Sequence, residues 1–187
     1  MMKKIIILAG SAGAPRTIIE LLKSIKKLKI PIIIALHSNS TQVNNLAELL
    51  KRTTKCEIEI IKQNTMLNNK IYLPFGGKNI VFISDEKLGV ESSSENLTPS
   101  IDKLLSSLKR ITNSEVHVFL LGGLGNDGTK GLMEIEHNKN IQIYLQNNAK
   151  FKYMIESAQK NLTKYKLVSL DFIKKTLNLL NGGENYA

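Results

Sequence analysis

Three residues whose side chains can together carry out acyl transfer each follow an apolar run typical of a strand buried on both faces. Ligands of open parallel sheets bind at the carboxyl ends of the strands, so polar residues that follow such runs are expected to converge. A hydroxyl, an imidazole and a carboxylate at one sheet edge form the set that acyl transfer requires. These residues are Ser11 after 5–9, His37 after 30–36, and Asp127 in a glycine-rich loop after 116–121.

The turn around Ser11 is close to a nucleophile elbow. Ala9-x-Ser11-x-Gly13 differs from G-x-S-x-G only at its first position, and it opens a predicted helix whose first N–H groups can stabilise an oxyanion. The order Ser, His, Asp along the chain is not the Ser, Asp, His order of α/β-hydrolases, so that fold is a poor match. Each residue also has a structural alternative: Ser11 and Asp127 as helix caps, and His37 as a hydrogen-bonded strand end.

The elements that must position these residues alternate between strand and helix. This pattern predicts an α/β fold, a doubly wound, mostly parallel sheet with helices on both faces. Residues 57–90 contain short strands separated by turn signals and no helical pattern, so we expect an antiparallel hairpin insertion there. The expected strands are 5–9, 30–36, 116–121 and 141–145. Helices are expected after Pro15, where apolar residues keep helical spacing from 18 to 25, at 41–51, 128–136, 152–160 and 171–180, and from near 99–100.

Composition narrows the function classes. The 187 residues carry 26 Lys and Arg against 16 Asp and Glu, a formal charge of +10. Only three are Arg and there is no Trp, so we expect no nucleic-acid partner. No apolar run reaches the roughly 18–20 residues of a membrane span, and the run 5–8 is short for a signal peptide, which favours a cytoplasmic protein. Cys56 is the single cysteine, and we expect it to lie in a strand. No spacing of Cys and His residues predicts a metal site.

A dinucleotide site is the competing interpretation. Gly123, Gly125 and Gly128 match G-x-G-x-x-G after a strand and before a helix. The acidic residue that should hold the ribose about 20 residues further on is missing, because the sequence there is Gln146-Asn147-Asn148. The glycine motif alone is weak evidence for a dinucleotide site, so we rank this interpretation second to acyl transfer.

Five segments in the same order resemble the catalytic domain of the chemotaxis protein-glutamate methylesterases of the CheB type. Residues 8–15 are similar to its I-G-A-S-T-G-G-P turn, 34–37 to its V-Q-H strand end, 72–77 to its Y-x-A-P-G-G hairpin, 99–102 to its R-P-S-V-D helix start and 121–128 to its L-T-G-M-G-x-D-G loop. The similarity spans nearly the whole chain. It implies one methylesterase domain over 1–187 without the family's receiver domain.

The resemblance implies a role for each site residue. Ser11 would be the nucleophile, His37 the general base and acid, and Asp127 the group that orients the imidazole, with the backbone N–H groups of Leu124 and Ala12 as oxyanion donors. The family hydrolyses glutamate γ-methyl esters on the cytoplasmic helices of methylated chemoreceptors, some members also deamidate glutamine, and no cofactor is needed.

The chain departs from the family pattern at several positions. Leu124 replaces the usual Met, Asn79 stands where a His often follows the glycine pair, and 146–153 lacks the family's acidic and G-M-P elements. These changes leave open a receptor-binding protein with impaired catalysis.

Overall fold

The computed structural model describes residues 2–93 and 98–183 and is built on a seven-stranded sheet. Its strand order is β10-β9-β8-β1-β2-β5-β3, and every neighbouring pair is parallel. β1 and β2 each contain three consecutive isoleucines, and β8 is buried from Val116 to Leu120, as expected where both faces are covered. The strands are β1 Lys3–Gly10, β2 Ile32–Leu36, β3 Ile58–Ile61, β5 Ile71–Pro74, β8 Ser114–Leu120, β9 Ile141–Gln146 and β10 Lys166–Val168.

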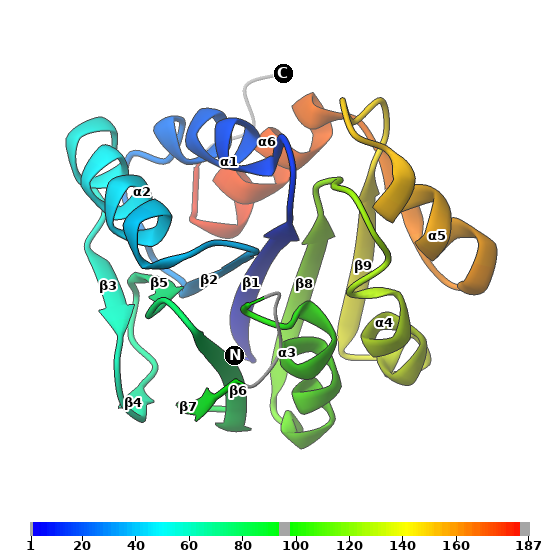
Figure 1. Cartoon of the computed structure of the whole chain (residues 1–187), viewed down its shortest axis with the longest axis horizontal. Coiled ribbons are helices and arrows are strands. Elements are labelled where there is room, and N and C mark those ends of the chain that lie inside the picture. The colour runs from blue at the N-terminus through cyan, green and yellow to red at the C-terminus, as the bar shows by residue number, and fades with distance from the viewer. Residues whose placement is uncertain (1, 94–97, 184–187) are drawn as a thin grey trace.

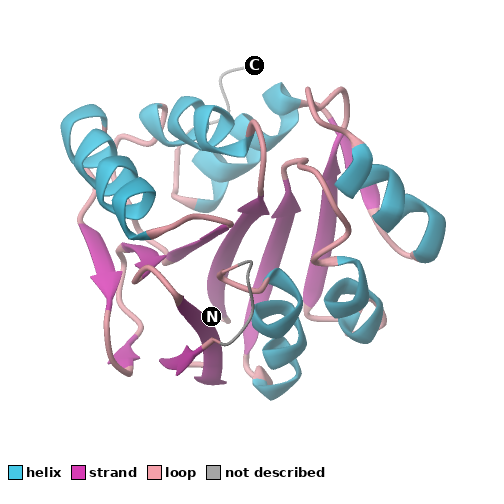
Figure 2. Cartoon of the chain, viewed as in Figure 1, coloured by secondary structure: helices cyan, strands magenta, loops and turns pink. Residues whose placement is uncertain are grey.

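Helices cover both faces of this sheet (Figures 1 and 2). Successive side chains of a strand point to opposite faces, so Ile5 and Ile7 pack with α3, α4 and α5, while Ile6 and Leu8 pack with α1, α2 and α6. The doubly wound, mostly parallel fold is therefore confirmed. The helices are α1 Ala14–Lys23, α2 Ser40–Thr53, α3 Ile101–Ser107, α4 Thr129–Ile135, α5 Tyr153–Asn161 and α6 Leu170–Leu180, with a 3-10 turn at Leu108–Arg110.

The middle of the chain confirms the antiparallel insertion but corrects its extent. Only β4 (Thr65–Met66), β6 (Lys78–Ser84) and β7 (Lys87–Ser92) form the separate antiparallel sheet. β3 and β5, expected in the ribbon, belong to the main parallel sheet. The prediction failed because parallel neighbours are normally joined through a helix, whereas 62–70 makes this crossover with only the short β4.

Smaller differences have local causes. β10 was not predicted, because it is only three residues long and has two exposed positions. Cys56 lies in the turn before β3 rather than in a strand, although its side chain is buried. Among residues 2–93 and 98–183, no helix is long and apolar enough to cross a membrane.

The strand order places a topological switch point at the centre of the sheet. The chain winds from β1 through β2 toward β3 on one side, and β8, β9 and β10 lie on the other side of β1. The direction of winding therefore reverses between β1 and β8, which is where open α/β sheets bind their ligands. The loops that follow β1, β2 and β8 leave three adjacent strands at this point.

Candidate active site

Ser11 lies in the turn between β1 and α1. Its N–H donates to the carbonyl of Gly122 (3.0 Å), and its own carbonyl accepts from the N–H of Ala14 (3.1 Å). Gly10 has no room for a side chain, since a Cβ there would meet the Ala14 Cβ at 2.7 Å and the Gly122 oxygen at 2.8 Å. The start of α1 and the loop after β8 therefore both pack directly on the turn that carries Ser11.

A short hydrogen bond joins His37 and Asp127. His37 leaves the end of β2, and its Nε2 lies 2.7 Å from Asp127 Oδ2. The two side chains are 10% and 18% exposed, so bulk water screens the pair little. Because Nε2 faces the carboxylate, Nδ1 is the ring nitrogen left for a substrate or a serine hydroxyl.

The first N–H groups of α3 also bind the Asp127 carboxylate. Ile101 N donates to Oδ2 and Asp102 N to Oδ1, both at 2.8 Å. Burial raises the pKa of Asp127, but the bonds from His37, Ile101 and Asp102 outweigh it and hold the pKa below its usual value. Asp127 is thus kept ionised, which suits a group that stabilises a positively charged imidazole.

Asp102 is a second carboxylate in this cluster, and it is not among the residues that were predicted to form the site. Its Oδ1 accepts from Gly128 N (3.0 Å) and Gly131 N (2.6 Å), which fixes the loop carrying Asp127 to the start of α3. Burial and the nearby charge of Asp127 raise the pKa of Asp102 despite these two bonds. The sequence around Pro99–Asp102 did mark the start of a helix. However, an acidic residue in the first turn is ordinarily explained by the helix dipole, so it did not indicate that Asp102 binds the loop of Asp127.

The glycine loop after β8 reaches over Ser11. Gly123 has φ +151, and a Cβ there would lie 2.9 Å from Ser11 N and overlap Ser11 Oγ. The next residue, Leu124, donates its N–H to Ser11 Oγ (3.0 Å), and the hydroxyl lies 3.3 Å from the Leu124 carbonyl. The N–H of Leu124 therefore points at the serine oxygen, whereas that of Ala12 makes no such contact, and the oxyanion roles of both residues stay predictions.

The segment before α5 holds the other side of this loop. Gly123 donates its N–H to the Phe151 carbonyl (2.8 Å), and its carbonyl accepts from Met154 N (3.1 Å). The Phe151 ring also limits the space at Gly13, where a Cβ would lie 3.0 Å from it. No local sequence pattern marks 151–154 as part of the site, because these contacts are made across the chain.

The small antiparallel sheet is hydrogen-bonded to both ends of α3 through β6. Asn79 of β6 is fully buried, and its Oδ1 accepts from Ser100 N (2.7 Å), directly before the first helical residue. Phe82 N donates to the buried Ser107 hydroxyl at the other end of the helix (2.8 Å). The insertion therefore determines where α3 presents its N–H groups to Asp127.

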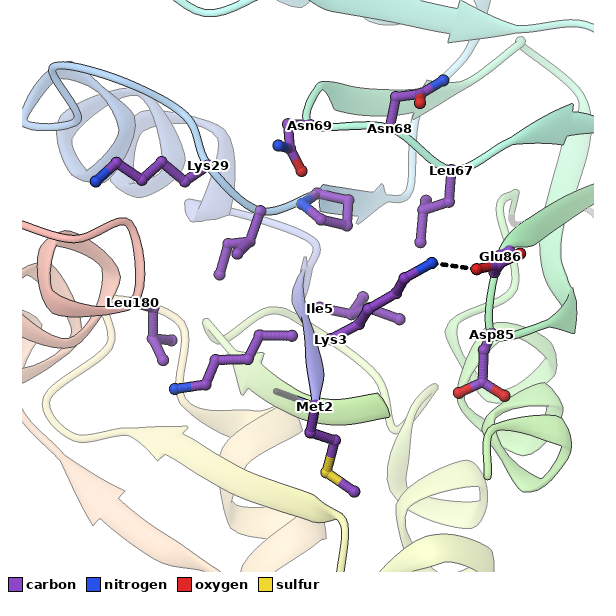
Figure 3. Close-up of a pocket in the computed structure, with 13 residues that line it drawn as sticks. Met2, Lys3, Ile5, Lys29, Leu67, Asn68, Asn69, Asp85, Glu86 and Leu180 are labelled. Carbon is purple, nitrogen blue, oxygen red and sulfur yellow. Dashed lines mark hydrogen bonds and ion pairs between the residues drawn. The ribbon is translucent and has the colours of Figure 1, made fainter. Parts of the chain in front are cut away.

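Other polar features lie outside this site. His117 is buried within β8, with its Nε2 2.8 Å from Glu115 Oε1, and burial lowers its pKa. A hollow of about 490 Å³ lies at the opposite edge of the sheet (Figure 3), where Lys3 pairs with Glu86 and the Asp85 carboxylate accepts from two backbone N–H groups. In the described part of the chain, no His, Cys, Asp and Glu side chains are grouped as a metal site would need.

The geometry of the glycine loop disfavours the dinucleotide alternative. The N–H groups of Gly123 and Gly128 donate to Phe151 O and Asp102 Oδ1, and that of Leu124 donates to Ser11 Oγ. A pyrophosphate cradle needs such donors to be directed at the ligand.

A doubly wound α/β domain with Ser, His and Asp side chains at its switch point defines a hydrolase-like architecture. The family model for CheB methylesterase matches residues 6–177, and the chain belongs to this family. It is similar in fold to the CheB methylesterase catalytic domain of Thermotoga maritima, with a TM-score of 0.82 over 96% of this chain and 100% of that one at 18% identity.

Two relatives with similar sequences are named as enzymes that act on protein glutamate and glutamine side chains. The chain is 26% identical over 163 residues to protein-glutamate methylesterase/protein-glutamine glutaminase 2 of Methanospirillum hungatei, covering 85% of this chain and 47% of that protein. It is 26% identical over 147 residues to the Bacillus subtilis protein-glutamate methylesterase/protein-glutamine glutaminase, covering 75% and 41%. The chain thus spans less than half the length of these relatives.

Proposed function

We propose that this chain is a cytoplasmic protein-glutamate methylesterase domain that hydrolyses glutamate γ-methyl esters on the cytoplasmic helices of chemoreceptors, and deamidates glutamine at the same sites. The observation that supports the proposal is the placement of Ser11 and His37 directly after Gly10 and Leu36, which are register partners on adjacent strands, with His37 Nε2 2.7 Å from Asp127 Oδ2. Family membership and the names of the relatives support the substrate class. Residues 1–187 act as one such domain and need no cofactor.

The proposed reaction has two steps. The Ser11 hydroxyl turns from Leu124 O, gives its proton to His37 Nδ1 and attacks the ester carbonyl. The tetrahedral oxyanion is held by the N–H groups of Leu124 and Ala12, and methanol leaves with the proton from His37. Water, deprotonated by His37, then attacks the acyl-enzyme and releases the glutamate carboxylate and Ser11. Asp127 stabilises the imidazolium in both steps.

The test is methanol release from a methylated chemoreceptor fragment. Ser11→Ala should lower turnover by about 10³–10⁶-fold while leaving the fold intact, as expected when the nucleophile of a triad is removed. Labelling of Ser11 by a fluorophosphonate provides a readout that does not depend on the receptor. Methanol release at the wild-type rate by Ser11→Ala would refute the role of Ser11.

The second candidate is a receptor-binding protein without esterase activity. It is favoured by the resting position of the Ser11 hydroxyl, which bonds to both backbone groups of Leu124. Catalytic hydrogen bonds are often long or misaligned before substrate binds, so this geometry also fits an active enzyme. Receptor binding without methanol release and without fluorophosphonate labelling would select this alternative.

A further inference from the structure

A second hollow of about 490 Å³ lies between the loop 24–31, which follows α1, and the carboxyl-terminal part of α6. Two side-chain amides join these elements. Asn178 Nδ2 donates to Ser24 Oγ (3.2 Å), and Asn181 Oδ1 accepts from the N–H of Lys29 (2.9 Å). The two walls are therefore held together before any ligand binds, and the volume is within the range of pockets that hold small molecules.

Four lysine side chains line this hollow, and no Asp or Glu of residues 2–93 and 98–183 lines it. We call Lys26, Lys27, Lys29 and Lys175 the lysine site. A Cβ at Gly182 would meet the ammonium group of Lys29, so the glycine lets this cation lie directly against the backbone at the end of α6. Positive charge is thus brought to the hollow from both of its walls.

No nearby carboxylate neutralises this charge. Residues 21–31 and 172–183 contain six lysines and no Asp or Glu. All four members of the lysine site are exposed, and none of them forms an ion pair with another residue that the structure describes. Like charges held close together repel one another, and a bound anion relieves that repulsion.

The helix dipoles account for little of this charge. A cation stabilises the last turn of a helix, and the effect falls off beyond that turn. α1 has Lys23 in its last turn and ends at the C-cap Ser24, so three members of the lysine site lie beyond it. α6 has no basic residue in its last turn, because Lys175 is in the middle of the helix. The lysine site therefore favours a bound anion rather than the helix ends.

The side chains that line the hollow indicate the class of anion. An ammonium group is a compact charge with three donors that binds phosphate well, whereas bidentate recognition of a carboxylate favours Arg, and no Arg lines this hollow. Four ammonium groups match more than one phosphate. Leu179 is 45% exposed and lines the same hollow, so it offers an apolar contact for an organic group.

The lysine site is at the edge of the sheet opposite Ser11. The loop 24–31 leads into the start of β2, whereas Ser11 follows the end of β1, and these two strands are parallel (Figure 1). Lys29 also lines the hollow beside the first residues of β1, where Figure 3 labels it. A ligand of the lysine site therefore leaves Ser11 open to a substrate.

We propose that the lysine site binds a small organic phosphate that carries two or more phosphate groups, of the class of nucleoside diphosphates and triphosphates. The phosphates contact the lysine ammonium groups, and the organic part packs on Leu179. This inference does not depend on the proposed function, because the lysine site shares no residue with Ser11, His37 and Asp127.

The test is isothermal titration calorimetry of the whole chain with ATP and with inorganic triphosphate. Lys27→Gln/Lys175→Gln should raise both dissociation constants at least about tenfold, since it removes two charge-assisted contacts. Lys139→Gln/Lys160→Gln is the matched control, because it changes the net charge equally at two exposed lysines, in the turn after α4 and on α5. The control should bind as wild type does, and added salt should weaken binding in both.

A second variant tests the organic part of the ligand. ATP should bind more tightly than inorganic triphosphate by about threefold, the size expected for partial burial of one leucine side chain. Leu179→Ala should remove this difference and leave the dissociation constant of triphosphate unchanged. If ATP binds Leu179→Ala as it binds wild type, the assigned contact with the organic part is wrong.

Four results would overturn the lysine site. The first is no binding of either phosphate by wild type at about 1 mM. The second is an equal loss of affinity in the control, which would indicate attraction by net charge alone. The third is protection of Ser11 by ATP from fluorophosphonate labelling, in wild type and in Lys27→Gln/Lys175→Gln alike, which would place ATP at the glycine loop. The fourth is binding only to phosphatidylglycerol vesicles or to duplex DNA.

Discussion

Replacing Gly123 by Ala tests the geometry of the site most directly, because the reason for a glycine there is steric and local. Gly123 has φ +151, which L side chains rarely adopt, and its Cβ would overlap Ser11 Oγ and lie 2.9 Å from Ser11 N. The backbone at this position cannot shift freely, since its N–H and carbonyl are bonded to Phe151 and Met154. The substitution must therefore displace Ser11, the Leu124 N–H or both.

The expected effect has two parts. Placing a Cβ at this φ costs about 1–3 kcal/mol of folding free energy. Moving the Leu124 N–H away from the developing oxyanion lowers kcat by about 10²–10³, which corresponds to about 2.7–4 kcal/mol in the transition state. Stability is measured by urea unfolding, and activity by methanol release and by the rate of fluorophosphonate labelling of Ser11.

Gly125→Ala is the matched control in the same loop. Gly125 has φ +81, but a Cβ there would meet nothing within 4 Å. This variant should lose about 1–2 kcal/mol of stability from the left-handed backbone alone and keep the wild-type kcat/KM. If both variants lose activity equally, backbone strain rather than the overlap with Ser11 is responsible. If Gly123→Ala labels at the wild-type rate, the assigned packing over Ser11 is wrong.

Two further outcomes are expected at carboxylates that accept hydrogen bonds from backbone N–H groups. Asp102→Ala should lose about 1–3 kcal/mol of stability and at least tenfold in kcat, because the N–H groups of Gly128 and Gly131 lose their acceptor. Asp102→Asn should restore most of both, since one amide oxygen can accept both bonds; equal defects in urea unfolding and methanol release would contradict this. Burial raises the pKa of Glu136, but bonds from Thr163 and Lys164 outweigh it and lower the pKa below its usual value. The stability that Glu136 contributes is therefore present above its unfolded-state pKa, about 4.3, and is lost as pH falls through the lower folded-state value. Glu136→Gln should cost about 1 kcal/mol at pH 7 and less below pH 4, and a pH-independent difference in urea midpoint would refute it.

Local patterns in the sequence were sufficient for much of the fold. The Ile-rich runs of β1 and β2 predicted strands buried on both faces, and helical spacing after Pro15 predicted α1. The glycines on both sides of Ser11 and before Asp127 marked tight loops at strand ends. Each of these signals depends on neighbouring residues and a single element, so it can be read before the chain is folded.

The tertiary structure decided which distant groups meet. It placed β3 and β5 in the parallel sheet, set Asp102 against the loop of Asp127, and brought 151–154 against Gly123. These contacts join residues far apart in the chain, and their register is chosen by the packing of whole layers rather than by any short pattern. The sequence alone therefore determined the chemical groups and the strand ends that carry them, whereas the assembled sheet determined their mutual geometry.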